Sequence, residues 1–354
     1  MKEGWRKKYL VKEFRLRSGD YLSSKMMEEG SIPVYGGNGI TGFHNQSNIE
    51  GRHIIIGRVG ALCGNVHMTT DRAWVSDNAF VVDDINDNWD IFYLAYILKY
   101  LNLNQYASQT AQPVISNKSL KDVVVSLPPL PEQHRIVEHL DSSFAKIDAL
   151  KANAEKMVEE AKALFASALK EAMTPKEGWE EKTLPEISEN LDGRRRPVTK
   201  GKRSAGIYPY YGASGIVDYV ASYIYDEDIL LISEDGANLI ARSTPIAFSV
   251  TGKVWVNNHA HVVRFETMTT QRFVEYYFSS IKIDEYVTGA AQPKLTQKNL
   301  NIIPIPLPPI HDQQCIVAHL DDLSAKVRQL EANYKKVSAE CDALKQSILR
   351  ETFE

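Results

Sequence analysis

The sequence has few cysteines, no long hydrophobic run and no large excess of charge of one sign. Its three cysteines, Cys63, Cys315 and Cys341, are far apart and include no Cys-x-x-Cys pair, which argues against a disulfide framework and a cysteine-rich zinc site. The apolar runs are only a few residues long, whereas a membrane-spanning helix needs about 20 apolar residues. The first residues lack the apolar core of a signal peptide. We therefore expect a cytoplasmic protein with no membrane segment.

The charge balance excludes a uniformly basic nucleic-acid coat protein. The chain has 354 residues, of which 41 are Lys or Arg and 45 are Asp or Glu, so the formal net charge is −4. DNA binding through local clusters of basic residues remains compatible with this balance, because binding depends on local potential. The length predicts two domains, or three.

Motifs for catalysis and for metal or nucleotide binding are also missing. The sequence contains no GxxxxGK[ST] phosphate-binding loop and no HExxH zinc motif. Gly37–Gly42 matches GxGxxG, but no apolar strand precedes it and no helical pattern follows it, so we reject a dinucleotide site. We expect no catalytic residue, no metal site and no cofactor in this chain.

What the sequence does contain is an internal duplication. Seven segments recur in the same order about 174 to 181 residues later, which indicates a duplicated domain rather than a short structural repeat. The matched pairs are Lys2–Trp5 and Lys176–Trp179, Ile32–Gly36 and Tyr208–Gly212, Ile54–Ala61 and Leu230–Ala237, Trp74–Asn78 and Trp255–His259, Ala111–Pro113 and Ala291–Pro293, Leu127–Leu130 and Leu307–Ile310, and His139–Asp141 and His319–Asp321.

Each copy begins with short β-branched runs and ends in a long helix after a pair of prolines. No Gly or Pro follows Pro131 before Thr174, or Pro309 before the C-terminus, and about 42 helical residues would extend roughly 60 Å. We predict four parts: a globular domain at residues 1–131, a helix at 132–174, a second globular domain at 175–311 and a second helix at 312–354.

The helical segments carry heptad repeats that predict pairing of the two helices. In the second helix the expected contact positions are Leu320, Val327, Tyr334, Cys341 and Ile348, with Leu323, Leu330, Val337 and Leu344 between them. In the first helix they are Leu140, Ile147, Ala154, Ala161 and Ala168, with Leu150, Met157 and Leu164 between them. Phe144, Val158 and Phe165 lie off this seam, so we predict that they contact a further helical partner.

These features resemble one known family. Ile32–Gly39, Gly57–Gly60, Gln112-Pro113 and Leu127–Gln133, in a chain that repeats the whole unit, resemble the DNA-specificity subunit of type I restriction–modification systems. The resemblance covers the entire chain. It implies an α+β fold with two tandem α/β target-recognition domains, each followed by a long helix, and an antiparallel coiled coil with pseudo-twofold symmetry.

The resemblance also implies a function and a set of partners. Each domain would recognise one half of a bipartite sequence in double-stranded DNA, and the helices would set a fixed gap between the halves. Two methyltransferase subunits, which bind S-adenosylmethionine and methylate adenine, would dock on the helices, and restriction subunits would join them. The chain itself would be non-catalytic.

Basic residues are the first candidates for DNA contacts. Arg58 lies between glycines after an apolar strand, where its guanidinium fork would suit a guanine edge or a phosphate. A second cluster contains Arg194, Arg195, Arg196 and Lys202, which would contact phosphates. Weaker candidates are Lys118, Arg242, Lys294 and Lys298. The alternative for each is an ordinary solvated surface position.

Polar residues in glycine- or proline-containing loops form the second group of candidates. Asn38 and Ser214 lie at the tips of two Tyr-Gly loops, beside Tyr35 and Tyr211, and Asn and Ser side chains can hydrogen-bond to base edges. Gln112 and Gln292 precede prolines that stiffen their loops. These residues also suit purely structural turns. The competing functions are a nucleic-acid-modifying enzyme with its own recognition domain, and a coiled-coil scaffold with binding heads.

Overall fold

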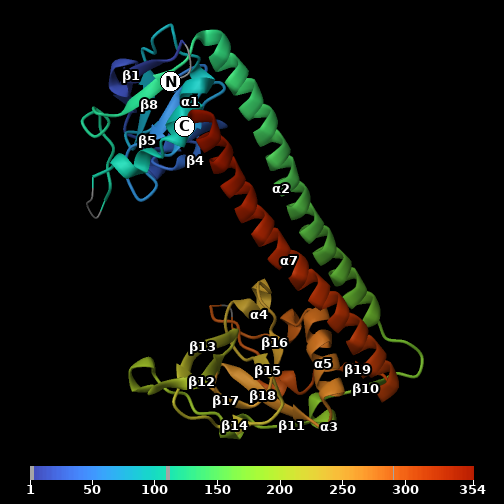
Figure 1. Cartoon of the computed structure of the whole chain (residues 1–354). Helices are drawn as coiled ribbons and strands as arrows, with labels where there is room; N and C mark the ends of the chain where they lie inside the picture. The colour runs from blue at the N-terminus through green and yellow to red at the C-terminus, as the bar shows by residue number, and fades with distance from the viewer. Residues whose placement is uncertain (1–3, 109–111, 290) are drawn as a thin grey trace. The chain divides into compact units, whose positions relative to one another are not determined.

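The computed structural model describes residues 4–108, 112–289 and 291–354, so Ala111 of the repeated Ala-Gln-Pro motif lies outside the described residues. The chain forms two compact units, one made of residues 1–154 and 335–354 and the other of residues 155–334. Two long helices, α2 (Leu130–Ala172) and α7 (Ile310–Phe353), contribute to both units (Figure 1). Within the described residues, no helix is long and apolar enough to cross a membrane.

The first globular domain contains two antiparallel-rich sheets and one covering helix. The four-stranded sheet has the order β2 (Arg15–Ser18), β8 (Ala79–Asp83), β5 (Ile54–Gly57) and β6 (Val66–Met68). The three-stranded sheet has the order β4 (Gly39–His44), β3 (Ile32–Gly36) and β7 (Trp74–Val75). A separate ribbon pairs β1 (Arg6–Tyr9) with β9 (Val124–Leu127). Ile54, Ile55 and Ile56 are fully buried, which explains their continuous apolar run.

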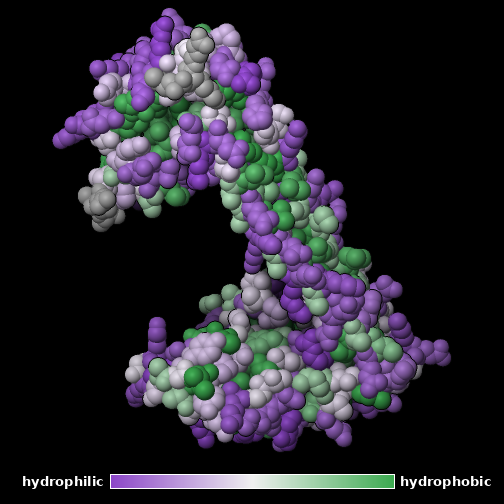
Figure 2. Space-filling model, viewed as in Figure 1, coloured by the Kyte–Doolittle hydropathy of each residue, from purple (hydrophilic) through white to green (hydrophobic). Residues whose placement is uncertain are grey.

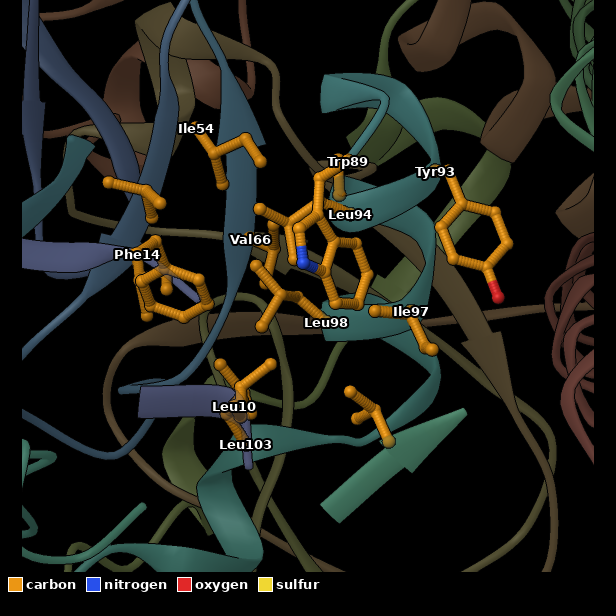
Figure 3. Close-up of a cluster of buried hydrophobic side chains, with 14 of the residues drawn as sticks. Leu10, Phe14, Ile54, Val66, Trp89, Tyr93, Leu94, Ile97, Leu98 and Leu103 are labelled. Atoms are coloured by element: carbon orange, nitrogen blue, oxygen red, sulfur yellow. The ribbon is translucent and has the colours of Figure 1, made fainter. Parts of the chain in front are cut away.

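Helix α1 (Ile91–Tyr100) closes the core of this domain. Its N-terminus is capped by Asp90, whose carboxylate accepts hydrogen bonds from the backbone N–H groups of Phe92 and Tyr93. The buried face of α1 includes Leu94 and Leu98, which belong to the same cluster as Ile54 and Val66 of the sheet (Figure 3). The helix thereby fixes the sheet whose strand ends carry the candidate loops.

The second globular domain repeats this arrangement. One four-stranded sheet has the order β11 (Ser188–Asn190), β18 (Ala260–Phe265), β15 (Ile229–Ser233) and β16 (Ala247–Val250). The other has the order β13 (Gly215–Val220), β12 (Ala205–Gly212), β17 (Lys253–Val256) and β14 (Tyr225–Asp226). The remaining elements are the covering helix α5 (Met268–Ser280), the ribbon of β10 (Glu180–Lys182) and β19 (Ile305–Leu307), and the short helices α3 (Leu184–Ile187), α4 (Asn238–Ala241) and α6 (Gln297–Leu300). The predicted α+β fold with a long helix after each domain is confirmed.

A buried glutamine joins each long helix to the domain before it. Gln133 is fully buried; its Nε2 donates to the carbonyls of Asn88 and Pro128, and its Oε1 accepts from the N–H of Asp90. In the second copy the Nε2 of Gln313 donates to the carbonyl of Pro308. Gln133 therefore ties the start of α2 to the first domain, and Gln313 holds the proline segment that leads into α7.

Ion pairs show that the two long helices run antiparallel in the first unit, and a further pair joins them in the second. In the first unit Asp148 pairs with Lys345 at 2.5 Å, and Lys151, further along α2, pairs with Asp342 at 3.1 Å. In the second unit Lys162 pairs with Glu331 at 3.2 Å. Because these pairs are largely exposed, they specify register more than they add stability.

The contact face of α2 differs from the predicted one. Leu150, Met157 and Leu164 are 57%, 57% and 64% exposed, so they do not form the seam. The buried face of α2 includes the predicted Leu140 and Ile147. A heptad seam has two contact positions, and here the second position lies four residues after the first rather than the predicted three. Both spacings give a heptad pattern, and Lys151 interrupts the four-residue series whereas Leu150, Met157 and Leu164 are all apolar.

Phe144, Val158 and Phe165, predicted to contact a separate partner, occupy this second seam position and have partners within the chain. The ring of Phe144 lies 5.5 Å from that of Tyr96 in α1, and the ring of Phe165 lies 6.5 Å from that of Tyr276 in α5. Val158 is only 6% exposed. The structure therefore does not support these three residues as a free face of α2.

Each globular core also includes residues from the end of a long helix. In the first unit Leu349 of α7 is 2% exposed, and the ring of Phe353 lies 5.6 Å from Tyr93 and 5.4 Å from Tyr100. In the second unit Leu169, near the end of α2, and Met173, directly after it, join the core of the second domain. The first domain therefore depends on residues far from it in sequence.

We expect Leu349→Ala to destabilise the first unit by about 2–5 kcal/mol, because it removes a buried side chain and leaves a cavity. Urea unfolding of the whole chain should show a lower midpoint for this unit. Leu344→Ala, on the same helix but 50% exposed, is the matched control and should change stability by no more than about 0.5 kcal/mol. Equal effects of the two substitutions would contradict the role of Leu349.

Candidate nucleic-acid interface

Three segments of the first domain meet at the ends of its central strands. They are the turn between β3 and β4, the loop after β5, and the Gln112-Pro113 loop. The N–H of Gly60 donates to the carbonyl of Pro113 at 3.0 Å, and the N–H of Ile115 donates to the carbonyl of Arg58 at 2.9 Å. A Cβ atom on Gly57 would lie 2.0 Å from the carbonyl oxygen of Gly37. Glycine at position 57 therefore permits the close approach of the first two segments.

The three segments border an open cleft of about 390 Å³. Its polar lining includes Ser23, Ser24, Thr41, Ser76, Asn78 and Gln112. Gly36 and Gly37 also line it and expose backbone beside these side chains. An open cleft with hydroxyl and amide groups matches the donors and acceptors at the edges of nucleic-acid bases.

The second domain joins the equivalent segments by the same backbone hydrogen bonds. The N–H of Gly236 donates to the carbonyl of Pro293 at 3.0 Å, and the N–H of Leu295 donates to the carbonyl of Glu234 at 2.8 Å. The N–H of Glu234 also donates to the carbonyl of His259 at 2.9 Å. The equivalent bond in the first domain joins the N–H of Arg58 to the carbonyl of Asn78, also at 2.9 Å. The two domains therefore share one loop framework and place different side chains on it.

Arg58 is directed into this framework rather than away from it. Its Nη1 donates to Ser18 Oγ at 3.1 Å and to the carbonyl of Asp77 at 3.4 Å, and its guanidinium lies 5.3 Å from the ring of Phe80. The free guanidinium fork expected from the sequence is therefore not present in this structure. Its contact with DNA remains a prediction that would require the side chain to change partners.

A buried network of charges occupies the equivalent position in the second domain. His261 Nδ1 lies 2.7 Å from Asp192 Oδ2, and Arg195 donates to Glu234 at 2.6 Å. Lys294 pairs with the other oxygen of Glu234 at 3.0 Å. Burial alone would raise the pKa of Asp192 and of Glu234, but the cations around each carboxyl outweigh burial and lower both values.

Asp192, Glu234 and His261 are close enough to hold a metal ion, but their surroundings do not favour one. The carboxylates already accept from Arg195 and Lys294, and Asp192 also accepts from the N–H of Val262. A divalent cation would have to displace cations that neutralise these oxygens. The cluster is better explained as an internal ion-pair network that joins the arginine segment to the Gln292-Pro293 loop.

The basic candidates divide into internally paired and exposed residues. Arg194 pairs with Glu227 at 2.5 Å and lies over the ring of Tyr225, while Arg242 donates to the carbonyls of Phe278 and Ile281 at the end of α5. Arg195 has only 15% of its side chain exposed. Lys294 is exposed but pairs with Glu234, and the other exposed basic candidates are Lys118, Arg196, Lys202 and Lys298.

The loop candidates divide in a similar way. Tyr35 is 9% exposed, and Tyr211 contacts the ring of Phe248, so both tyrosines support their turns. The tip residues Asn38 and Ser214 are exposed, and Asn38 Oδ1 accepts a hydrogen bond from Asn65. Gln112 and Gln292 are also exposed. The segments that carry Asn38, Arg58 and Gln112 meet in the first domain.

Sequence reasoning missed two further groups. Asn78 and His259 lie at the same position of a segment that recurs in both copies, and the recurrence indicated only the duplication. The different side chains at this position are the sequence signal that distinguishes the two copies there. The second group lies on the β12–β13 hairpin, where Ile207, Val217 and Tyr219 are 80%, 56% and 52% exposed. Exposed apolar side chains on a two-stranded ribbon have no distinctive sequence signal.

These features define a class of protein with two related binding domains on paired long helices. The model of the type I restriction modification DNA specificity domain matches residues 3–160 and again residues 176–338. These two matches cover most of the chain, which therefore belongs to this family.

Individual relatives agree with this assignment. The specificity subunit of type I restriction enzyme EcoprrI from Escherichia coli is 35% identical over 144 residues, which cover 38% of this chain and 35% of that protein. The EcoBI specificity subunit, also from E. coli, is 24% identical over 312 residues, covering 74% of this chain and 64% of that protein. The first of these matches thus spans only about a third of the relative.

Solved structures show the same fold. The HsdS subunit from Thermoanaerobacter tengcongensis aligns over 100% of this chain and 97% of its own, with 18% identity and a TM-score of 0.54. A chain from a structure of complex assembly and conformational transition in the type I R-M system aligns over 99% and 98%, with 17% identity and a TM-score of 0.72.

The lowered carboxyl pKa values predict that the second unit loses stability in acid. In the folded state the carboxyls of Asp192 and Glu234 bind protons less readily than in the unfolded state. Their contribution to the free energy of unfolding is therefore complete above the ordinary pKa values of 3.8 and 4.5, and it disappears as the pH falls through the lower pKa values of the folded state. Urea midpoints of this unit measured from pH 7 to pH 3 should fall below about pH 4.5.

Asp192→Asn tests the network directly. It removes the carboxylate that pairs with His261 and Arg195 and leaves Glu234 as the remaining counter-charge, so we expect a loss of about 1–3 kcal/mol at pH 7 and a weaker dependence of the midpoint on acid. Asp226→Asn, at an exposed position of the same unit, should have little effect. A wild-type midpoint and acid dependence in Asp192→Asn would show that the network does not stabilise the unit.

Proposed function

We propose that this chain is the DNA-specificity subunit of a type I restriction–modification complex. Each globular domain recognises one half of a bipartite sequence in double-stranded DNA, and the paired helices determine a fixed gap between the halves. The observation that carries the proposal is the duplication of one loop framework with different side chains on it. Recognition of two short sequences by one chain needs this combination of a constant support and variable contacts.

The differences between the copies support two different half-site sequences. Arg58 in the first domain is replaced by Glu234 in the second, and Asn38 by Ser214. Arg and Asn favour guanine and adenine edges respectively, whereas Ser accepts several bases. Phosphate contacts from the exposed Arg196, Lys202 and Lys298 would add affinity without sequence preference. Lys118 would serve this role in the first domain.

The chemistry belongs to partners in this proposal. A specificity subunit directs methyltransferase subunits, two in number, to adenines in the target, and restriction subunits join the complex. S-adenosylmethionine binds to the methyltransferase and not to this chain. Because the substrate is cellular DNA, the complex works in the cytoplasm.

The first test is to co-express this chain with its methyltransferase partner and to map modified adenines by single-molecule sequencing. We expect one bipartite motif with a fixed gap. The methyltransferase expressed alone is the control and should leave the DNA unmodified. An assembled complex that binds S-adenosylmethionine but modifies no bipartite motif would contradict the proposal and favour the scaffold alternative. Modification by this chain alone would favour the enzyme alternative.

The exposed stripe on α2 is the proposed docking face for the methyltransferase. We define the α2 stripe as Leu150, Met157 and Leu164, which recur every seven residues and are each more than half exposed. Hydrophobic residues are visible on the surface along α2 (Figure 2). Apolar side chains at this spacing suit knobs-into-holes packing with another helix, so the occupant is a helix of the methyltransferase subunit.

Charge on the α2 stripe should therefore prevent assembly. We expect Met157→Glu to weaken co-purification of the methyltransferase at least about tenfold, because docking would bury an unpaired carboxylate. Glu159→Gln, an exposed position on the same helix, is the control. The unfolding midpoint of the isolated chain should not change, since Met157 is exposed. Normal assembly of Met157→Glu would exclude the stripe as the docking face.

A further inference from the structure

One position in each globular domain lies where the three loop segments meet, and it carries a different exposed polar residue in each copy. The position is Asn78 in the first domain and His259 in the second. Each residue directly precedes the strand that pairs with the end of the central strand, since Gly57 pairs with Ala79 and Ser233 pairs with Ala260. We call it the junction position.

Hydrogen bonds hold the backbone of the junction position identically in the two domains. The N–H of Asn78 donates to Ser76 Oγ at 3.3 Å, and the N–H of Ser76 donates to the carbonyl of Tyr35 at 2.8 Å. In the second domain the N–H of His259 donates to Asn257 Oδ1 at 2.8 Å, and the N–H of Asn257 donates to the carbonyl of Tyr211 at 3.1 Å. The junction position is therefore tied to the Tyr-Gly turn as well as to the loop after the central strand.

The side chains at this position are available to a ligand. Asn78 is exposed and lines the cleft of the first domain together with Gln112. Its closest side-chain partner is the neighbouring Asp77, at 3.5 Å, which is too long to hold the amide firmly. An exposed carboxamide beside a cleft can present both its donor and its acceptor to one base edge.

In the second domain an acidic residue orients the junction side chain. His259 Nδ1 lies 2.9 Å from both carboxylate oxygens of Asp235. Because a carboxylate only accepts hydrogen bonds, Nδ1 carries the hydrogen and Nε2 is the atom left for a ligand. Only 15% of the Asp235 side chain is exposed, against 48% for His259, so the inner residue positions the outer one.

Asp235 is itself fixed by the third segment. Its backbone forms an isolated antiparallel bridge with Lys294, two residues after Gln292. The imidazole is thereby held beside the Gln-Pro loop at a defined angle. This arrangement differs from a solvated surface histidine, whose ring would have no fixed partner.

From this geometry we infer that Asn78 and His259 are specificity-determining residues, each contacting a base edge in the half-site of its own domain, and that Asp235 is a positioning residue for His259. The inference rests on the proposed function. The two side chains offer different hydrogen-bonding groups at one structurally fixed position. Each domain would therefore prefer a different base there.

The test exchanges the two junction residues in the assembled methyltransferase complex and maps modified adenines by single-molecule sequencing. We expect His259→Asn to reduce modification of the original motif about tenfold and to change the accepted base at one or two positions of one half-site. Asn78→His should change the other half-site only. His311→Asn, an exposed residue at the start of α7, makes the same substitution away from the loops and should keep the motif.

Asp235→Ala separates orientation from contact. With His259 present but not held, discrimination should relax at the same position that His259→Asn alters, and all other positions should stay unchanged. Unfolding midpoints and co-purification of the methyltransferase, measured for every variant, identify a variant that fails to fold or assemble. If His259→Asn fails in this way, His259→Gln, which also keeps a polar side chain at the position, replaces it in the sequencing experiment.

The outcomes distinguish failure of this inference from failure of the proposed function. If the wild-type complex produces no bipartite motif, the proposed function is wrong. A wild-type bipartite motif that remains identical in assembled His259→Asn and Asn78→His complexes would overturn the junction residues alone. Uniformly weaker modification of an unchanged motif would also overturn the inference, because it would indicate phosphate contacts without base preference.

Discussion

The structure depends on the burial of a long-helix end in each globular core. Leu349 and Phe353 complete the core of the first unit, and Leu169 and Met173 complete that of the second. A domain of this size with small sheets and one covering helix has limited apolar area of its own. Sharing the long helices supplies additional area and fixes their register. Because each core includes part of a helix that leaves it, the direction of that helix is determined by core packing and by the buried Gln133 or Gln313 rather than by a flexible linker.

The recognition surface follows from a second constraint, which is the need to hold three loops together. In both domains backbone hydrogen bonds join the loop after the central strand to the Gln-Pro loop and to the junction position, and the segment of the junction position bonds to the Tyr-Gly turn. In the second domain the ion pair of Glu234 and Lys294 adds a link between side chains. Side chains at the surface are then free to differ. This explains how the copies retain Gln112 and Gln292 at equivalent places while Asn78 and His259 differ, and why the fold tolerates an arginine at one position and a glutamate at its equivalent.

Sequence patterns predicted the elements that depend on repetition and periodicity. The duplication, the two long helices and the proline-marked start of each helix were evident because they recur over many residues. The contact face of α2 was not, since Leu150 and Phe144 each fit a heptad and only packing against Tyr96 separates them. The arginine cluster was also ambiguous: sequence shows Arg194, Arg195 and Arg196 as one group, but the first two have buried or fixed acidic partners that lie about 33 to 39 residues away. Such pairings depend on tertiary structure and leave no local signal.

The exchange of Arg58 for Glu234 shows how one framework accommodates opposite charges. In the first domain the guanidinium finds neutral acceptors, Ser18 and the carbonyl of Asp77, and an aromatic ring. In the second, the carboxylate is balanced by Arg195 and Lys294, and Asp192 and His261 lie beside them. A charge reversal at a partly buried position would normally be costly. Here Arg195 and Lys294 compensate it, so the loops keep their arrangement and the ionisation of this network becomes part of the stability of the second domain.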